Sequence, residues 1–297
     1  MPLVFRPFQP QFVAEVTGID LRAPPDEALC AEITAAADRY AVLIFPNQRI
    51  TDAQHIAFSH PFGRLETTIK TYRPGFQARL PAEVADISNL DETANILPTN
   101  DRRRRMSALG NRLWHTDYTF KPTPGLYSLL SAHGIPREGG QTQFTDLRAA
   151  YDALPERMKS RIDGLIAEHS QLYSRGTIGF TDFSPEETSR LGSAPQPLVR
   201  VHPGSKRKIL YLASHAMLIH GMDIREGRIL LADLMDHATR PEFAHTHDWT
   251  EGDMVLSDNR RTMHRACAYN PGDIRDLHRT KVMEPTLPMA ELTRTPA

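Results

Sequence analysis

The 297-residue chain is predicted to be mainly β, with flanking helices around a jelly-roll core. After residue 111 the sequence breaks into short apolar segments separated by Gly and Pro, which is typical of a β-sandwich or jelly roll. Two longer segments in the same half have helical character and are expected to pack outside the sheets. No repeat or change of composition marks a domain boundary, so residues 1–297 are interpreted as one domain.

The N-terminal part is expected to supply one short strand, one buried strand and two helices. Residues 13–21 indicate a strand and a turn, and residues 26–40 carry apolar side chains at helical spacing. The apolar run 41–45 predicts a buried strand that ends at the following proline. A second helix, 52–59, follows a threonine suited to cap it.

Residues 66–111 form a segment rich in Pro and Gly, with one short strand expected at 84–88. A loop of this length in a compact domain is usually functional, and we interpret it as a mobile lid. Its run of four arginines, 102–105, is interpreted either as a solvated surface or as part of a lid that attracts an anionic substrate.

The second half completes the expected list of elements. Strands are expected at 126–132, 142–145, 198–201, 209–213, 243–249, 254–257 and 280–283. Helices are expected at 147–166 and 224–240.

Composition excludes several classes of protein. The net charge of -1 argues against a nucleic-acid partner, and the longest apolar runs are far shorter than the ~20 residues that cross a bilayer. The chain has two cysteines, Cys30 and Cys267, which excludes a disulfide framework. With no secretory signal expected, we predict a cytoplasmic protein with a small-molecule partner, and homo-oligomerisation stays open.

One His-x-Asp triplet, His115 and Asp117, carries the first chemical signal. Side chains two residues apart on an extended segment point the same way, so both can bind one ion. Further along, a strand enters an Asp-Asn turn at 258–259 and His264 follows. Two histidines and one carboxylate are the ligands of non-haem Fe(II) oxygenases. Taken alone, His264 could equally be a hydrogen-bonded core histidine.

A competing metal set lies in the same half of the chain. His245, His247 and Glu251 have the His-x-His-x-x-x-Glu spacing of cupins, but the glycines expected beside that spacing are absent. The simpler interpretation is that these histidines share one face of a strand.

Over about residues 13–282 the sequence resembles the 2-oxoglutarate-dependent Fe(II) dioxygenases of the taurine and 2,4-dichlorophenoxyacetate dioxygenase group. The matching segments are 42–45, 57–58, 62–63, 114–117, 139–142, 146–155, 252–253, 258–260 and 264–265. Segments 69–70 and 85–89 place it nearer the herbicide-cleaving branch. In that branch a tryptophan often precedes the Asp-Asn-Arg segment, and here the residue is Ser257.

The resemblance implies a double-stranded β-helix and specific roles for site residues. It assigns Fe(II) to His115, Asp117 and His264. It assigns the far carboxylate of 2-oxoglutarate to Arg275, assisted by Thr142.

The resemblance also assigns an acidic prime substrate to Arg279. Strand alternation places Arg279 and Arg275 on one face. Lys70 is a candidate second contact for the substrate acid. Without the metal motif, the two arginines could be solvated residues of an edge strand, and Lys70 an exposed loop lysine.

The activity so implied is a dioxygenase that uses Fe(II), 2-oxoglutarate and O2. Its expected substrate is a small anion, an aryloxyalkanoate whose ether is cleaved after hydroxylation. A sulfonate, a sulfate ester or another small carboxylate is the alternative within the class, and a non-catalytic metal-binding β-barrel is the alternative outside it. Arg275 and Thr142 favour the enzyme, because a metal site alone needs neither.

Overall fold

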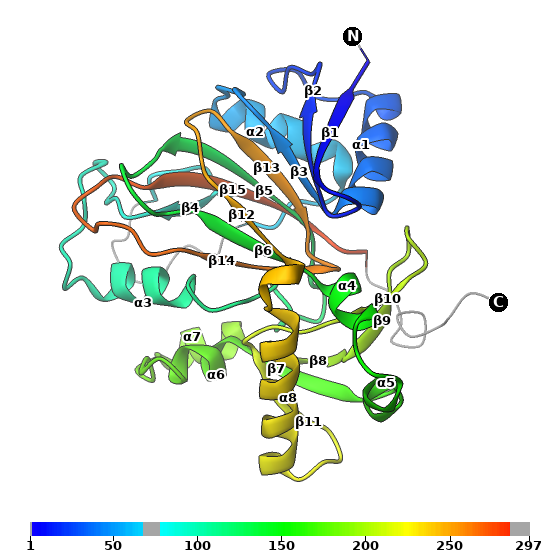
Figure 1. Ribbon diagram of the computed structural model, residues 1–297. Coiled ribbons are helices and arrows are strands. Elements are labelled where there is room, and N and C mark those ends of the chain that lie inside the picture. The colour runs from blue at the N-terminus through cyan, green and yellow to red at the C-terminus, as the bar shows by residue number, and fades with distance from the viewer. Residues whose placement is uncertain (1, 68–77, 286–297) are drawn as a thin grey trace.

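A computed structural model of the chain describes residues 2–67 and 78–285, and its centre is a seven-stranded sheet (Figure 1). The strands of this large sheet lie in the order β1 (Val4–Gln9), β2 (Val13–Thr17), β3 (Val42–Phe45), β13 (Met254–Asp258), β5 (Gly125–Gly134), β15 (Asp276–Met283) and β4 (Ala85–Ser88). All neighbours are antiparallel except β2 and β3.

A second, three-stranded sheet faces the large one. It contains β12 (Ala244–His247), β6 (Thr142–Asp146) and β14 (Thr262–Ala266), with β6 in the middle. Phe144 of β6 packs against Val42, Ile44 and Val255 of the large sheet. Two facing antiparallel sheets with an apolar filling are the jelly-roll arrangement, so the predicted fold class is confirmed.

Two helices cover the outer face of the large sheet (Figure 1). Helix α1 (Glu27–Tyr40) is capped by Asp26, and α2 (Asp52–Ser59) begins with a capping box on Thr51. Side chains at the inner face of α1 pack on the apolar side chains of β3 and β13, because the helix buries its apolar stripe. Both helices and the strand between them were correctly predicted.

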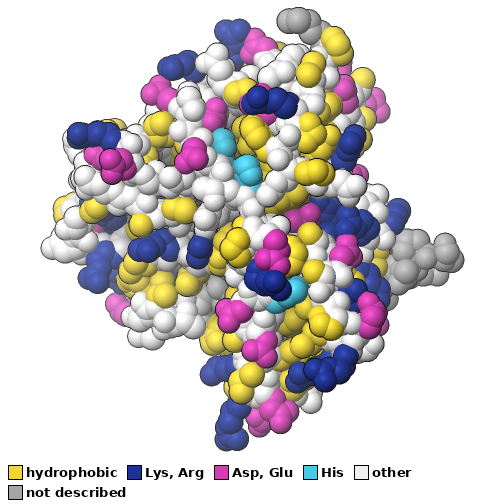
Figure 2. All heavy atoms as spheres, viewed as in Figure 1, with side chains coloured by type: hydrophobic (Ala, Val, Ile, Leu, Met, Phe, Trp, Pro, Cys, Tyr) yellow, Lys and Arg dark blue, Asp and Glu magenta, His cyan; other side chains and the backbone are white. Residues whose placement is uncertain are grey.

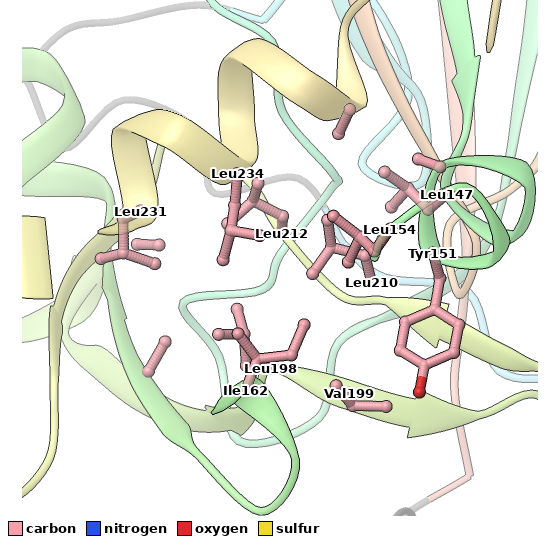
Figure 3. Packing of buried hydrophobic residues seen from close by; sticks show 14 of the residues in the cluster. Leu147, Tyr151, Leu154, Ile162, Leu198, Val199, Leu210, Leu212, Leu231 and Leu234 are labelled. Carbon is pink, nitrogen blue, oxygen red and sulfur yellow. The ribbon is translucent and has the colours of Figure 1, made fainter. Parts of the chain in front are cut away.

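A third layer lies beyond the smaller sheet and has its own core, shown in Figure 3. Its helices are α4 (Leu147–Asp152), α5 (Glu156–Ile162), α6 (Gln171–Gly176), α7 (Pro185–Leu191) and α8 (Ile224–Ala238). Its strands are β7 (Ile166–Ser170), β8 (Ser193–Pro197), β9 (Val199–Val201), β10 (Lys208–Leu210) and β11 (Ala216–Ile219). Leu231 and Leu234 of α8 point into this core together with Leu198 and Leu212.

The expected single helix 147–166 is wrong. Pro155 interrupts it, so α4 ends at Asp152 and α5 begins at Glu156. The strand β7 then starts at Ile166, where the chain pairs with β8 and β11. The apolar residues that suggested one long helix belong to three different elements of the same core.

The expected irregular segment 66–111 is also partly wrong. Its arginine run begins helix α3 (Arg102–Gly110), which Asp101 caps. Arg104 is buried and donates hydrogen bonds to the carbonyls of Leu97 and Pro271, so this arginine is structural rather than solvated. The strand at β4 is confirmed, Lys70 lies outside the described residues, and the mobility of a lid stays a prediction.

The expected strands of the second half differ mainly in length. Residues 243–249 divide into a 3-10 turn, η2 (Pro241–Phe243), and strand β12, and another 3-10 turn, η1 (His60–Phe62), follows α2. The predicted strand 280–283 is the end of β15, which begins at Asp276. Strands β1, β7, β8, β11 and β14 were not predicted.

None of the helices within the described residues is long and apolar enough to span a bilayer. Basic and acidic side chains are interspersed over the face of the molecule shown in Figure 2.

Candidate metal and cosubstrate site

Two histidines from distant parts of the chain are paired through their backbones. The His115 N–H donates to the His264 carbonyl at 3.0 Å, and the His264 N–H donates to the His115 carbonyl at 2.8 Å. Antiparallel partners that exchange both bonds project their side chains from the same face. The imidazole centroids are consequently 4.4 Å apart.

Asp117 completes the cluster two residues after His115. One ligand atom from each of His115, Asp117 and His264 lies within 4.8 Å of the others, and all three side chains are buried. The structure thus brings together the three residues predicted from the sequence. Two histidines and one carboxylate around one point form the facial set that leaves coordination positions open on an octahedral metal.

Neighbouring groups hold these side chains in position. His115 Nδ1 lies 2.7 Å from the Leu113 carbonyl, which can only accept, so Nδ1 carries the proton and Nε2 is left with its lone pair. Ser128 Oγ donates to Asp117 Oδ2 at 2.5 Å, and the Asn259 amide donates to the same Ser128 Oγ at 3.0 Å. Within the described residues, the buried Nδ1 of His264 has no hydrogen-bond partner. An unsatisfied buried nitrogen in this cluster fits a bound metal ion.

Burial sets the protonation of the cluster. It lowers the pKa of His115 to about 3 and that of His264 to about 4, because a buried imidazole is difficult to charge. Burial alone would raise the pKa of Asp117, but Arg279 and Lys281 outweigh it and hold that pKa well below its ordinary value. At neutral pH the three side chains are therefore two neutral imidazoles and one carboxylate, which is the state that binds a metal.

A buried ionic network fixes the turn that leads into His264. Asp258, the last residue of β13, contacts His202 Nε2 at 2.9 Å and Arg260 Nη2 at 2.6 Å. These contacts hold the pKa of Asp258 well below its ordinary value despite its burial. The predicted Asp-Asn turn is confirmed, and its role in the fold is to start β14 at the register that pairs His264 with His115.

The cluster faces a cavity of about 620 Å³. His115 and Asp117 line one part of it, and the apolar side chains of the segment 78–111 line another, among them Leu80, Val84 and Met106. Strand β15 and the residue before it contribute three cations to the same wall: Arg275, Arg279 and Lys281.

Arg275 is 5% exposed and makes no ion pair with any carboxylate of the described residues. Its Nε donates to the Gly140 carbonyl at 3.2 Å, and its backbone N–H donates to Asn89 Oδ1 at 3.0 Å. Burial lowers the pKa of Arg275, since no anion compensates the guanidinium. A fixed, buried and uncompensated guanidinium is suited to bind a carboxylate in a bidentate way.

Thr142 lies at the start of β6, two residues after Gly140, and is buried. Its Oγ1 accepts a hydrogen bond from the Trp249 indole at 3.0 Å, which leaves the hydroxyl hydrogen free to donate. Thr142 is near the Arg275 contact in sequence but does not line the cavity.

Arg279 approaches the metal cluster more closely than the sequence suggested. Its Nη1 lies 3.0 Å from Asp117 Oδ1 and 2.9 Å from Oδ2. The structure therefore places Arg279 beside the predicted metal ligand, while Arg275, one residue before β15, pairs with no carboxylate of the described residues.

The competing cupin set is not brought together. Glu251 pairs with Arg49 at 2.9 Å, His247 Nε2 lies 3.2 Å from Asp253, and the His245 ring packs on Phe8. None of these histidines belongs to a candidate metal cluster in residues 2–67 and 78–285. Ser257, where a tryptophan was expected, is buried in β13 and donates to the Ser128 carbonyl at 3.4 Å.

Several cations that line the cavity were not predicted from the sequence, among them Lys281 and Arg175. Lys281 follows Arg279 by two residues, so strand alternation could have placed it on the same face. Arg175 of α6 lines the cavity from the third layer, and burial alone lowers its pKa to about 10. No sequence pattern relates Arg175 to the metal motif, because only the tertiary fold brings α6 to the cavity.

Comparison with known proteins agrees with this geometry. Residues 5–281 match the family model described as taurine catabolism dioxygenase TauD, TfdA family. The chain is 39% identical over 284 residues to an alpha-ketoglutarate-dependent 2,4-dichlorophenoxyacetate dioxygenase of Cupriavidus pinatubonensis, covering 96% of this chain and 99% of that protein. It is 38% identical over 271 residues to an (S)-phenoxypropionate/alpha-ketoglutarate-dioxygenase of Sphingobium herbicidovorans, covering 89% of each.

Among solved structures, AAD-2 in complex with Mn(II) and N-oxalylglycine superimposes with a TM-score of 0.87 at 43% identity, covering 97% of this chain and 100% of that one. The match to the family model extends over nearly the whole chain, and it includes the segments that carry both histidines and Asp117. The chain therefore belongs to the TauD, TfdA family of dioxygenases.

Proposed function

We propose that the chain is an Fe(II)- and 2-oxoglutarate-dependent dioxygenase that hydroxylates an aryloxyalkanoate and so cleaves its ether. One observation carries the proposal. A buried set of two neutral imidazoles and one carboxylate lies on the same cavity as Arg275, a buried guanidinium without a carboxylate partner in the described chain. Relatives named for 2,4-dichlorophenoxyacetate and phenoxypropionate support the substrate class.

His115, Asp117 and His264 would hold Fe(II), and their protonation at neutral pH suits this role. When bound, the iron supplies O2 activation coupled to decarboxylation of 2-oxoglutarate. N-oxalylglycine, a dicarboxylate of the same shape as 2-oxoglutarate, occupies the related AAD-2 together with Mn(II). The overall reaction converts an aryloxyacetate, O2 and 2-oxoglutarate into a phenol, glyoxylate, succinate and CO2.

The chain's own residues bind and orient the two acids. Arg275 would receive the far carboxylate of 2-oxoglutarate, and Thr142, which does not line the cavity, stays the second donor that the family resemblance implies. Arg279 would orient Asp117 and face the prime substrate, with Lys70 as a further candidate contact. Apolar side chains such as Leu80, Phe120 and Phe183 line the cavity where an aryl ring would pack.

We further propose that the enzyme works in the cytoplasm as a single catalytic domain. Cys30 and Cys267 are free thiols, which fits a reducing compartment. 2-Oxoglutarate is an intracellular metabolite, so its use as cosubstrate fits the same compartment.

A turnover assay tests the proposed activity. The protein, loaded with Fe(II) and supplied with ascorbate, is incubated with 2-oxoglutarate and a panel of aryloxyalkanoates and alkylsulfonates. We expect succinate and a phenol in equal amounts with an aryloxyalkanoate and no phenol from the His115→Ala variant. If succinate forms only with sulfonates, the substrate is a sulfonate and not an aryloxyalkanoate. If no acid in the panel gives succinate, the result favours a non-catalytic metal-binding barrel.

A further inference from the structure

Lys281 of β15 is a buried lysine beside the candidate metal site. Its side chain is 6% exposed, and it lines the cavity together with Arg279, which lies two residues earlier on the same strand face. In the pairing of β15 with β5, Lys281 is opposite Ser128, the residue that donates to Asp117. Lys281 is therefore close to the metal end of the cavity.

The ammonium group of Lys281 rests on an aromatic ring. Lys281 Nζ lies 3.2 Å from the centroid of the Tyr118 ring, a cation–π contact that fixes the position of the charge. Tyr118 follows Asp117 directly and has a φ of 60°, in the left-handed region that a bulky residue rarely adopts. Such backbone strain occurs preferentially at functional sites.

Lys281 and Arg279 differ in whether they form an ion pair. Arg279 is 2.9 Å from Asp117, so its charge already compensates a carboxylate. Lys281 has no carboxylate within ion-pair distance in residues 2–67 and 78–285. Burial and the nearby Arg279 lower the pKa of Lys281 well below its ordinary value, and an incoming anion would favour the charged ammonium form.

Lys281 is also too far from Arg275 to share one carboxylate with it. Arg275 precedes the first residue of β15, and Lys281 lies near the other end of the strand. The separation along an extended chain is about 20 Å. An anion that pairs with Lys281 would therefore be distinct from the far carboxylate of 2-oxoglutarate.

We propose that Lys281, held on the Tyr118 ring, binds the acidic group of the prime substrate and determines the preference for acids. The inference rests on the proposed function. In an aryloxyalkanoate the carbon to be hydroxylated carries the carboxylate directly, so that carboxylate must be held beside the metal. Lys281 supplies at this position an amino group that is held on the Tyr118 ring and has no ion-pair partner in the described residues.

Calorimetry on the Mn(II)- and N-oxalylglycine-loaded protein tests the proposal without turnover. 2,4-Dichlorophenoxyacetate, its uncharged methyl ester and an alkylsulfonate are titrated into wild type, Lys281→Met and Lys281→Arg. We expect Lys281→Met to raise the dissociation constant of the acid at least tenfold and to leave that of the ester within twofold. Lys281→Arg keeps the charge and should recover most of the affinity.

Arg175→Met is the matched comparison, because Arg175 is a further buried cation of the cavity wall that pairs with no carboxylate of the described residues and is assigned to neither the metal nor 2-oxoglutarate. Unchanged acid binding in Lys281→Met would overturn the proposal, as would an equal loss for acid and ester, which would make Lys281 a packing residue. A loss confined to Arg175→Met would assign the acid to that residue instead.

The same titrations separate this inference from the proposed function. If wild type binds the sulfonate alone, and Lys281→Met weakens it, the role of Lys281 stands and the aryloxyalkanoate assignment fails. If wild type binds the aryloxyalkanoate and Lys281→Met binds it equally well, the aryloxyalkanoate assignment stands and the role of Lys281 fails. If wild type binds none of the acids, both fail together.

Discussion

Removing the guanidinium of Arg275 should affect cosubstrate binding and protein stability in opposite ways. In Arg275→Met, a bound 2-oxoglutarate would keep its far carboxylate buried without a cation. Breaking a buried ion pair in this way costs about 3–5 kcal/mol. The dissociation constant of 2-oxoglutarate should therefore rise by about two to three and a half powers of ten.

Stability of the ligand-free protein should not fall in the same variant. Arg275→Met loses the hydrogen bond from Nε to the Gly140 carbonyl, worth about 1.5 kcal/mol for a charged donor. It also removes a buried charge that no carboxylate of the described residues compensates, which relieves a penalty of about several kcal/mol. We expect an unchanged or higher Tm.

Anaerobic titration of 2-oxoglutarate into the Fe(II) protein measures the first effect through the charge-transfer band of the chelate, and calorimetry measures the second. Arg275→Lys is the control that keeps the charge but loses the bidentate geometry, and it should show an intermediate affinity. If Arg275→Met binds 2-oxoglutarate as tightly as wild type, or if its weaker binding follows simply from a lower Tm, the assignment of Arg275 is refuted.

Two further predictions concern groups outside direct contact with ligands. Ser128→Ala removes the hydroxyl that donates to Asp117, and it should weaken Fe(II) binding by about 10- to 100-fold in a metal-competition assay. If the variant binds Fe(II) as tightly as wild type, Ser128 does not orient Asp117. His278 lies between Asp52 and Asp276. Burial opposes its charge, but the two carboxylates outweigh burial and raise its pKa to about 9. The charged form stabilises the fold fully below about pH 6.5, and this stabilisation is lost as the pH rises through about 9. The Tm of wild type should therefore fall toward that of His278→Gln between these pH values, and parallel curves for the two proteins would contradict the assignment.

Local signals in the sequence identified the candidate metal ligands but did not show that they lie together. His115 and Asp117 share a face by strand alternation alone, and the Asp-Asn turn before His264 is a short-range feature. The pairing of His115 with His264 is a long-range contact, and no periodicity reports it. It became predictable through the resemblance to a family rather than through local physics.

Elements with polar or mixed sequences were harder to predict. Strand β14 consists of Thr262–Ala266 and contains both a histidine and an arginine, so it has no apolar run to mark it. Helix α3 begins with four arginines, which look like a solvated loop until the fold supplies carbonyl acceptors for Arg104. Tertiary contacts, and not local composition, determine the secondary structure of these two segments.

Iron stoichiometry tests the central claim, that His115, Asp117 and His264 hold one Fe(II). Wild type, His264→Ala and His245→Ala are loaded with Fe(II) without oxygen, separated from free metal and analysed for iron per chain. We predict one iron per chain in wild type and in His245→Ala, and none in a folded His264→Ala. A full complement of iron in His264→Ala, or its loss in His245→Ala, would contradict the proposed site.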